Sequence, residues 1–372
     1  MDVKKVVEAY DDVSVGIFGS HSAKEIGMAA KAWNLKTVIV VQKGRDKLYT
    51  KYNRHLYDEI VSLESFKDIT NKEVQERLIE LNTIFIPNRS FAVYVGYDRI
   101  EKSFKVPIYG NRYLLRAEER NTERNQYYLL EKAGVRIPKV YKSPEDIDRL
   151  VVVKVQQAKN PLERAFFYAV SQEDYYKQAE ELIKAGIISN ETLSKARIEE
   201  YVLGARFNAN FHSFALKDVF GDFDFVGFSD RRQVNLQGFL NLPARDQLKI
   251  NIPVRNEEIG HFGVTMRESK QEMVYDAAEK LLRVCEKEYP PGIIGSFGLQ
   301  GAVAYSPEND ELEFVVFDVS FRVPGDPAIG PTSPEMRNLS LKHKVKIEDP
   351  LDLTMMEIKK AFEIGRLPEV VT

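Results

Sequence analysis

The chain has 372 residues, of which 44% are hydrophobic and 29% are charged, the composition of an ordinary folded globular protein. This length exceeds what one compact core usually holds, so we expect two or three packed lobes. The formal net charge is −3, with Lys and Arg spread among Asp and Glu, which gives no electrostatic footprint for nucleic acid. Any anion that the protein binds must therefore be held by a local site.

Membrane insertion and secretion are also disfavoured. No apolar run reaches the roughly 20 residues needed to cross a bilayer, and Met1–Lys5 lacks the basic-then-apolar pattern of a signal peptide. A single cysteine, Cys285, excludes an intrachain disulfide framework and is typical of a reducing compartment. We therefore expect a cytoplasmic protein.

The first 115 residues predict a small open α/β sheet. Val13–Phe18 and Thr37–Val41 are apolar runs typical of buried strands, and Ala23–Trp33 between them has apolar residues at helical spacing. Strand, helix and parallel strand form one βαβ unit, which places the turn Gly19–Ser22 at the carboxyl end of the first strand. Further along we expect a helix at Lys72–Leu81, a strand at Thr83–Pro87 and a loop at Asn88–Ser90.

The remaining chain mixes strand and helix patterns. Leu150–Val155 is an apolar strand pattern, and Arg197–Val202 is a short strand-like run. Gly298–Tyr305 and Leu312–Ser320 flank a polar stretch and predict a β-hairpin. We also expect strands at Ala165–Val170, Ala205–Ala215 and Phe223–Phe228, helices at Arg124–Ala133, Tyr175–Ala185, Ser269–Lys287 and Asp352–Ile364, and a loop over a site at Val323–Pro334.

Lys154 is a candidate anion ligand, because a lysine in a hydrophobic strand is costly to bury and should face solvent or an anion. A solvated lysine at a strand edge is the commoner arrangement. The run Glu199, Glu200, Tyr201 and Val202 adds weight, since a short extended backbone can bond the edge of an adenine and a carboxylate can accept from ribose hydroxyls. Alone, such an acidic pair usually faces water.

Gln300 and Asp318 lie on the two strands of the predicted hairpin. Oxygen ligands from facing strands suit Mg²⁺, which keeps room for water and phosphate oxygens. Alternatively, Asp318 is a strand-end residue paired with Arg322, because structural ion pairs are common. The residues by themselves leave both interpretations open.

The histidines show no zinc spacing such as His-Glu-x-x-His. His21 lies in the first predicted turn after a strand, where Gly19, Ser20 and the start of a helix could receive an anion. That turn is neither a dinucleotide fingerprint nor a Walker P-loop, and the chain has no Gly-x-Ser-x-Gly elbow. Cys285 lies within an amphipathic helical pattern and is interpreted as a packing residue, not a nucleophile.

A series of short segments runs in order through nearly the whole chain: Gly19-Ser20-His21, Lys43-Gly44-Arg45-Asp46, Gly110-Asn111-Arg112, Leu115-Arg116, Ser143–Asp148, Val153-Lys154, Ile198–Val202, Pro243–Leu248, Arg267-Glu268-Ser269, Pro290–Gly295, Phe297–Gln300 and Val315–Ser320. Together they resemble the archaeal FAICAR synthetase family of the ATP-grasp superfamily, which joins formate to the purine precursor AICAR (aminoimidazole carboxamide ribonucleotide). Because the matches span the chain, the resemblance is more specific than any single motif.

The resemblance implies an α/β and α+β architecture, the ATP-grasp fold with an N-terminal open α/β lobe at 1–115, a small lobe at 116–203 and a large lobe with the metal site at 204–372. It implies an ATP-dependent carbon–nitrogen ligase that converts AICAR to FAICAR through formyl phosphate, with release of ADP and phosphate, in purine (IMP) biosynthesis. The implied cofactors are ATP and Mg²⁺, with Mn²⁺ as an alternative metal. The implied partners are small molecules and further copies of the chain, with neither nucleic acid nor a membrane.

The resemblance also implies roles for single residues. His21, Ser90 and His261 would contact the nucleotide substrate, and Arg322 would act in catalysis. Gln300 and Asp318 would bind the metal. ATP would be bound by Arg116, Lys154, Glu199, Glu200, Tyr201, Val202 and Gln233.

Several positions depart from the family pattern. Residues 156–164 replace a glycine-rich loop and contain no glycine, although backbone N–H groups approach phosphate most readily where side chains are absent. Arg89 and His261 stand where the family has glycine and asparagine, and Asp318 replaces a longer glutamate. Gln233 or its neighbour Val234 replaces another glutamate. Two alternatives therefore stay open: a ligase with a different acid or amine substrate, and a non-catalytic nucleotide-binding protein.

Overall fold

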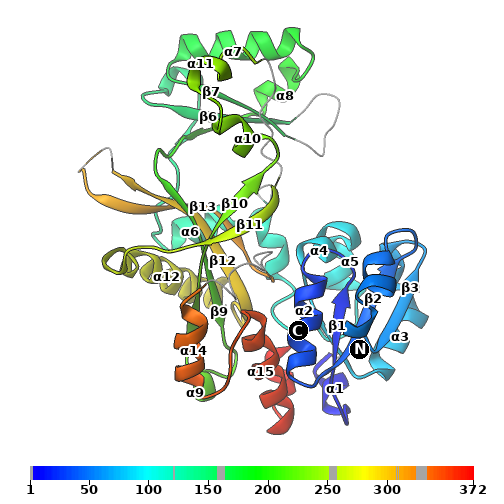
Figure 1. Cartoon of the computed structure of the whole chain (residues 1–372). Helices are drawn as coiled ribbons and strands as arrows, with labels where there is room; N and C mark the ends of the chain where they lie inside the picture. Colours follow the sequence, from blue (N-terminus) through cyan, green and yellow to red (C-terminus); the bar gives the residue numbers. More distant parts are fainter. Residues whose placement is uncertain are drawn as a thin grey trace. The chain divides into compact units, whose positions relative to one another are not determined.

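The computed structural model describes residues 3–119, 122–156, 164–250, 258–306, 308, 310–323 and 333–372 (Figure 1). Two compact units make up the chain: unit 1 is Met1–Val135, Arg206–Gly301 and Asp318–Thr372, and unit 2 is Arg136–Ala205 and Ala302–Phe317. The three lobes expected from the sequence stay a prediction. The part of the chain that the structure describes contains no helix with the length and apolar character needed to cross a membrane.

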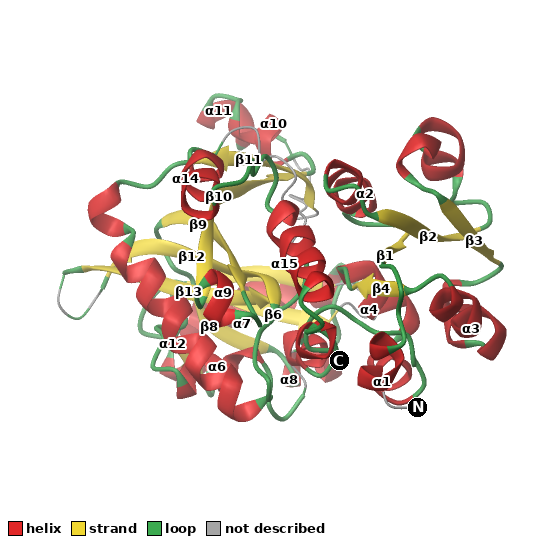
Figure 2. Ribbon diagram, turned by 90° about the horizontal axis from the view of Figure 1, so that it is seen from below, coloured by secondary structure: helices red, strands yellow, loops and turns green. Residues whose placement is uncertain are grey.

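Unit 1 begins with a parallel four-stranded sheet in the order β3-β2-β1-β4. The chain order reverses between β1 (Ser14–Phe18) and β4 (Thr83–Ile86), so the turns that follow these two strands meet at the carboxyl edge of the sheet. The helix α2 (Ala23–Ala32) connects β1 to β2 (Lys36–Gln42), which confirms the predicted βαβ unit. The edge strand β3 (Glu59–Leu63), next to β2 in Figure 2, escaped prediction because four of its five residues are exposed or only partly buried.

The loop predicted at Asn88–Ser90 is wrong, because a helix starts there. Asn88 accepts a hydrogen bond at Oδ1 from the Phe91 N–H at 2.9 Å and so caps the amino end of α4 (Arg89–Val95). Asparagine is among the residues favoured at this position. Only Asn88 lies outside the helix, and both Arg89 and Ser90 belong to its first turn.

The second sheet has five strands in the order β11-β10-β9-β12-β13. Its strands are β9 (Ala205–Ser213), β10 (Phe223–Gln233), β11 (Glu258–Val264), β12 (Gly295–Tyr305) and β13 (Leu312–Ser320). β10 runs antiparallel to both β9 and β11, and the predicted pair β12 and β13 are neighbours. β11 escaped prediction because its seven residues include two glycines, which weaken a strand pattern.

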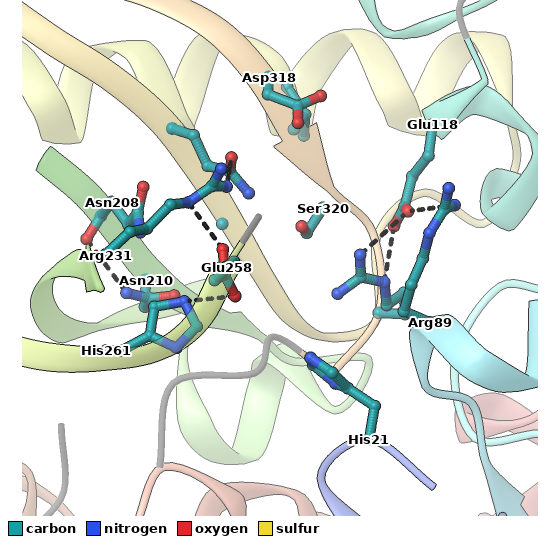
Figure 3. A pocket seen from close by; sticks show the side chains of 14 residues that line it. His21, Arg89, Glu118, Asn208, Asn210, Arg231, Glu258, His261, Asp318 and Ser320 are labelled. Carbon is teal, nitrogen blue, oxygen red and sulfur yellow. Dashed lines mark hydrogen bonds and ion pairs between the residues drawn. The ribbon is translucent and has the colours of Figure 1, made fainter. Parts of the chain in front are cut away.

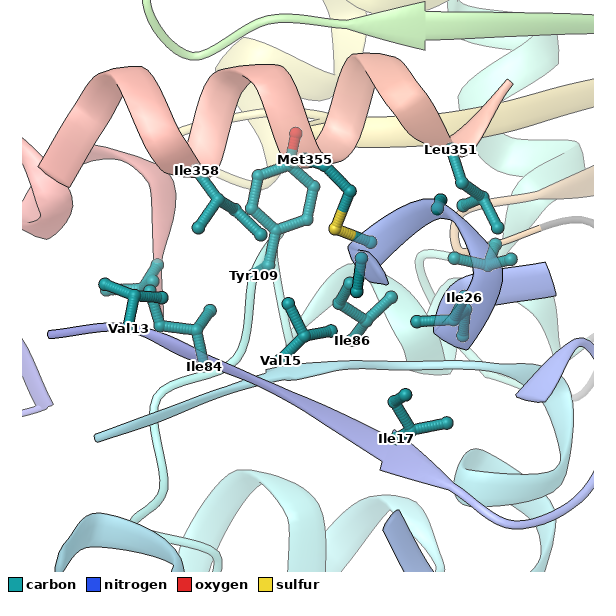
Figure 4. Packing of buried hydrophobic residues seen from close by; sticks show 14 of the residues in the cluster. Val13, Val15, Ile17, Ile26, Ile84, Ile86, Tyr109, Leu351, Met355 and Ile358 are labelled. Carbon is teal, nitrogen blue, oxygen red and sulfur yellow. The ribbon is translucent and has the colours of Figure 1, made fainter. Parts of the chain in front are cut away.

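Figure 4 shows how the C-terminal part of the chain completes the core of the parallel sheet. α15 (Leu351–Glu363) lays Leu351, Met355 and Ile358 against side chains of β1 and β4, including Val15 and Ile86. Each such fully buried aliphatic side chain contributes about 1.5–3 kcal/mol. The helix therefore joins residues more than 250 positions apart in one core.

Unit 2 contains a four-stranded sheet in the order β5-β8-β6-β7. Val151, Val153 and Val155 of β6 (Val151–Gln156) pack into its core, so the alternating Lys154 points to the opposite face. β6 pairs antiparallel with β7 (Arg164–Ala169) and β8 (Arg197–Glu200). The other elements of unit 2 are β5 (Val140–Tyr141), α7 (Gln172–Lys184), α8 (Asn190–Ser194) and η5 (Pro144–Asp146).

The remaining elements belong to unit 1. Longer helices are α3 (Lys72–Glu80), α12 (Glu272–Glu288) and α14 (Glu335–His343). Shorter ones are α1 (Val3–Glu8), α5 (Tyr97–Lys102), α6 (Gln126–Lys132), α9 (Lys217–Phe220), α10 (Leu236–Leu240), α11 (Ala244–Gln247), α16 (Leu367–Val370), and the single turns η1 (Leu48–Tyr52), η2 (Arg54–Leu56), η3 (Phe66–Thr70), η4 (Leu114–Glu118) and η6 (Glu268–Lys270). Cys285 is buried in α12, as predicted. The glycine-free stretch at 156–164 and the loop at Val323–Pro334 fall largely outside the described residues.

The carboxyl of Asp349, just before α15, generates a prediction about stability. Burial, with the nearby carboxylates of Asp352 and Glu25, raises the pKa of Asp349 to about 7. The stabilisation from its protonated form is complete below the unfolded pKa of about 3.9 and is lost as the pH rises through about 7. A pKa change of about three units corresponds to about 4 kcal/mol in the free energy of unfolding. Because Asp349 is partly in contact with solvent, we expect a contribution of about 2 kcal/mol.

Asp349→Asn keeps an oxygen for the Leu351 N–H, which Asp349 Oδ1 accepts at 2.8 Å, and removes the charge. We expect the variant to exceed the parent in free energy of unfolding by about 2 kcal/mol at pH 8 and to match it at pH 4. Urea unfolding at both pH values measures this. An equal difference at both would contradict the raised pKa.

Candidate functional site

A cavity of about 290 Å³ lies against one face of the five-stranded sheet, within unit 1 (Figure 3). Charged and amide side chains form most of its lining. The lining residues are His21, Arg89, Glu118, Asn208, Asn210, Arg231, Glu258, His261, Gly298, Gln300, Asp318, Val319, Ser320 and Arg322.

The sheet supplies much of this lining because lining residues, most of them polar, recur two apart on three strands, and residues two apart point to the same face. They are Asn208 and Asn210 of β9, Gly298 and Gln300 of β12, and Asp318 and Ser320 of β13. Gly298 leaves room for the Asn210 side chain on this face, because a Cβ at position 298 would lie 3.3 Å from Asn210 Oδ1. The opposite face carries aromatic residues such as Phe211, which stacks on Phe297.

Arg231, Glu258 and His261 form a charged cluster on β10 and β11, where Arg231 and His261 are paired in the strand register. Arg231 Nε lies 3.0 Å from one oxygen of Glu258, and His261 Nε2 lies 2.9 Å from the other. Arg231 also donates to Gln300 Oε1. Burial would raise the pKa of Glu258, but the bond from His261 and the charges of Arg231, His261 and His21 outweigh it and lower that pKa.

Glu118, Arg89 and Arg322 form a second charged cluster, of which Glu118 and Arg89 are labelled on the right of Figure 3. One carboxylate serves both arginines: Glu118 lies 3.2 Å from Arg322 Nε and 3.4 Å from Arg89 Nη1. Arg89 also contacts Glu119 at 3.1 Å. Glu118 is 6% exposed and Arg322 is 12% exposed, so water screens this pair weakly.

The turns after β1 and β4 bring His21 to the cavity. Asn88 donates through Nδ2 to the His21 carbonyl oxygen at 2.6 Å, which ties the first turn to the start of α4. Ser90 Oγ lies 2.9 Å from Ser20 Oγ across the same junction. Gly19 permits the tight turn, because a Cβ there would lie 2.8 Å from the Val40 carbonyl oxygen.

The structure collects five of the predicted site residues in one cavity: His21, His261, Gln300, Asp318 and Arg322. Ser90 is not among the lining residues, but it contacts Ser20, the residue before His21. Gln233 ends β10 opposite Glu258 in the strand register.

Arg116 lies outside the residues that line the cavity. Its guanidinium is held by Glu101 at 2.8 Å and by Asp98 at 2.7 Å, and these hydrogen bonds raise the pKa of Arg116. Its role in ATP binding stays a prediction.

The other predicted ATP ligands lie in unit 2. Lys154 and Arg197 both pair with Glu199, which is 1% exposed. The next carboxylate, Glu200, accepts from Arg136 at 2.7 Å and from the Lys139 N–H at 3.0 Å.

Tyr201 and Val202 follow the end of β8, and the Tyr201 ring packs edge-on against Tyr168 at 5.2 Å. The Glu199 carboxylate thus balances Lys154 on the face of the sheet opposite the core. Nucleotide binding by these residues stays a prediction.

The chemistry of the donor set allows a magnesium ion at Gln300 and Asp318. They offer one amide oxygen and one carboxylate on neighbouring strands of the sheet. Mg²⁺ is commonly held by one or two carboxylates plus phosphate oxygens and water. Among the residues that the structure describes, no group of three or more His, Cys, Asp or Glu is arranged to hold a metal by itself. A metal here would need ligands from a bound phosphate.

Sequence reasoning missed several lining residues: Glu118, Asn208, Asn210, Arg231, Glu258, Gly298, Val319 and Ser320. For the asparagines a signal existed, because polar residues alternate with apolar ones along the strand pattern at Ala205–Ala215. Glu118 carries no local signal, since Arg89 and Arg322 lie elsewhere in the chain, and Glu258 pairs both with the nearby His261 and with the distant Arg231.

Comparison with protein families matches both halves of the chain. A family profile described as "Domain of unknown function (DUF1297)" covers residues 174–372, and one described as "Protein of unknown function (DUF1246)" covers residues 15–141. Similar curated proteins share the name 5-formaminoimidazole-4-carboxamide-1-(beta)-D-ribofuranosyl 5'-monophosphate synthetase. That of Methanocaldococcus jannaschii is 39% identical over 327 residues, 87% of this chain and 86% of its own. That of Methanothermobacter thermautotrophicus is 34% identical and covers 100% of this chain and 98% of its own.

Solved structures identify the ATP-grasp fold. An IMP biosynthesis protein PurP from Thermococcus kodakaraensis superposes with a TM-score of 0.69 at 23% identity, covering 97% of this chain and 100% of its own. The N5-carboxyaminoimidazole synthetase of Staphylococcus aureus complexed with ADP gives a TM-score of 0.53 at 12% identity, covering 88% and 74%. The phosphoribosylglycinamide synthetase of Anaerococcus prevotii gives 0.51 at 15% identity, covering 92% and 77%. At these identities the likeness concerns the fold.

The lowered pKa of Glu258 generates a prediction about the cavity. Glu258→Gln removes the charge that joins Arg231 and His261 and should lower the melting temperature at pH 7. A carboxyl with a lowered pKa stabilises the fold above its unfolded value of about 4.3, and this contribution is lost as the pH falls through the folded value. The melting-temperature gap to the parent should therefore narrow between pH 7 and pH 3.

Thermal unfolding at several pH values measures this gap. Glu279→Gln, which alters an exposed pair with Arg283 on α12, is the control and should show a small gap throughout. A gap for Glu258→Gln that does not change with pH would contradict the assigned role of the charge.

Proposed function

Because the chain belongs to the family of 5-formaminoimidazole-4-carboxamide-1-(beta)-D-ribofuranosyl 5'-monophosphate synthetases, we propose that it is the ATP-dependent ligase that formylates AICAR with formate in purine (IMP) biosynthesis. The observation that carries this proposal is the cavity, which combines His21, His261, Arg322, Gln300 and Asp318 on one polar face. The implied substrates are small molecules: AICAR, formate and ATP.

The reaction sets the chemical demands on the site. A formate oxygen attacks the terminal phosphorus of ATP and ADP leaves; the amine nitrogen of AICAR then attacks the formyl carbon, phosphate leaves and the nitrogen loses a proton. An acyl phosphate is easily hydrolysed, so the site must exclude water, and cations must neutralise the transferring phosphoryl group. Arg322, and Arg89 beside it, supply such cations at the cavity wall.

The charge balance of the cavity favours a metal-dependent reaction. The lining contains three arginines (Arg89, Arg231, Arg322) and three carboxylates (Glu118, Glu258, Asp318), whose formal charges cancel. An anionic nucleotide therefore needs additional positive charge. A divalent cation, Mg²⁺ or alternatively Mn²⁺, held by Gln300 and Asp318 would supply it and would act as a Lewis acid toward phosphoryl oxygens. Protonated His21 or His261 would add to it.

Recognition of ATP is assigned mainly to unit 2. Lys154 forms an ion pair with Glu199 in this structure. When ATP binds, Lys154 would pair with phosphate oxygens instead. The segment Glu199–Val202 would hold adenosine. The roles of Arg116 and Gln233 in ATP binding stay predictions. Assembly into an oligomer of identical subunits and a cytoplasmic location stay predictions.

ADP release from purified protein tests the proposal. With ATP and Mg²⁺ present, release should require AICAR and formate together, and the product mass should be that of FAICAR. ATP binding without release under these conditions would reject this substrate pair.

A second candidate is a ligase of the same reaction type with a different acid or amine. The observation in its favour is Arg89, whose guanidinium lines the cavity and is held by both Glu118 and Glu119. ADP release with AICAR and a larger carboxylic acid, but not with formate, would establish this candidate.

The proposed metal site generates a prediction for Asp318. Asp318→Ala removes its carboxylate ligand, so Mg²⁺-dependent ADP release should fall by at least about 100-fold while the fold persists. Asp276→Ala alters an exposed carboxylate on α12 and is the control. Activity of Asp318→Ala close to that of the parent, at matched Mg²⁺ concentrations, would remove Asp318 from the metal site.

A further inference from the structure

The Glu118 carboxylate joins three segments that are far apart in the sequence. It ends η4, accepts the Phe321 N–H at 2.8 Å through Oε1, and lies 3.2 Å from Arg322 Nε through the same oxygen. Its Oε2 accepts from Arg322 Nη2 at 3.3 Å and from Arg89 Nη1 at 3.4 Å. A carboxylate offers about four acceptor positions, and Glu118 fills three of them with hydrogen bonds from Phe321, Arg322 and Arg89.

Glu118 and its neighbours also supply hydrogen-bond acceptors to the outer edge of the five-stranded sheet. β13 is the last strand in the sheet order, and Val319 and Phe321 donate their N–H groups to side chains in place of a neighbouring strand. Gln126 accepts from Val319 at 2.6 Å, and its Nε2 donates to the Glu118 carbonyl oxygen at 2.8 Å. The positions of Ser320 and Arg322 at the cavity therefore depend on Glu118 and Gln126.

We propose that Glu118 is a positioning residue, which holds the guanidinium groups of Arg322 and Arg89 toward the cavity so that they meet the acyl phosphate group. The inference rests on the proposed function and adds how its cations are oriented. Arg322 donates from Nη1 to the Val323 carbonyl oxygen at 3.2 Å and from Nη2 to Glu118 at 3.3 Å, and these bonds fix the plane of its guanidinium. An arginine side chain without such partners would sample many rotamers. Loss of a residue that orients a functional side chain through hydrogen bonds typically costs about 10- to 100-fold in activity.

Replacing Glu118 by glutamine removes the negative charge of the side chain and keeps its size. Glu118→Gln keeps the side-chain length and one oxygen for the Phe321 N–H. It also turns an amide N–H₂ donor toward guanidinium donors, which cannot accept it. Arg322 and Arg89 should then lose their common orientation while the strand edge stays capped.

A double-mutant cycle tests the proposal in the full-length protein. ADP release with ATP, Mg²⁺, AICAR and formate is measured for the parent, Glu118→Gln, Arg322→Met and the double variant. If Glu118 acts through the arginines, kcat falls about 10- to 100-fold in Glu118→Gln, and the same substitution causes a much smaller loss in the Arg322→Met background. The KM for AICAR should change much less than kcat.

Glu288→Gln is the matched control, because Glu288 is 13% exposed, pairs with Lys132 at 2.6 Å and lies outside the cavity lining. It should keep the parent kcat even if its melting temperature falls. Additive losses in the cycle, or a kcat of Glu118→Gln within about twofold of the parent, would overturn the proposal. If Glu118→Gln does not fold, the cycle is run with Glu118→Asp, which keeps the charge but not the reach.

A readout without turnover separates this inference from the proposed function. The arginine Nε–H region of the proton–nitrogen NMR spectrum should contain a protected Arg322 signal, identified by its loss in Arg322→Met. That signal should exchange rapidly with water in Glu118→Gln and persist in Glu288→Gln. If the parent protein releases no ADP, the proposed function fails, and an unchanged Arg322 signal in Glu118→Gln would then overturn the positioning role as well.

Discussion

The site depends on one constraint: a guanidinium or carboxylate that lies on a partly buried sheet face must have an oppositely charged partner. Removing an unpaired charge from water is costly, so the fold is committed to the segments that supply the partners. Glu118 pairs with Arg322 after β13 and with Arg89 in the first turn of α4. Glu258 of β11 pairs with His261 of the same strand and joins that strand to β10 through Arg231. The two carboxylates thus hold the catalytic candidates on either side of one cavity.

The parallel sheet contributes the remaining side of this arrangement. Its strand order reverses between β1 and β4, and open α/β sheets bind ligands at such reversals. The Asn88 side chain bonds the carbonyl oxygens of Phe18 and His21, so the two turns at the reversal form one structure. The apolar contact of α15 with β1 and β4 fixes the sheet from its other side. His21 therefore reaches the cavity from a rigid base.

Membership of the synthetase family and the departures from its pattern are compatible within this geometry. The oxygen donors Gln300 and Asp318 remain on adjacent strands, and Arg322 remains beside them. Arg89 brings an extra cation to the cavity wall, where ion pairs with Glu118 and Glu119 hold it. With Arg89 included, the formal charges of the three arginines and three carboxylates in the lining cancel, so the extra arginine leaves a site that can still hold a divalent cation and a nucleotide.

The sequence alone was sufficient for the elements whose signal is local. Hydrophobic periodicity predicted the βαβ unit, the strand with Lys154, the hairpin of β12 and β13, the buried Cys285 and α15, because burial of one face imposes a repeat that can be read along the chain. The spread of matching segments predicted the family and the ATP-grasp fold. Asn88 shows the limit, since the same residue suits a loop and a helix cap and only the following turn decides between them.

Tertiary structure decided which charges meet. Glu118 and Arg322 are separated by 204 positions, and nothing in either neighbourhood specifies the other. The strand β11 became a strand through its pairing with β10, against the weak local pattern of its two glycines. Likewise, Asn208 and Asp318 share a cavity only because β9 and β13 lie on the same sheet with β12 between them. Local sequence patterns indicate which residues are buried. The partner of a buried charge, in contrast, can come from any segment that the tertiary structure brings next to it.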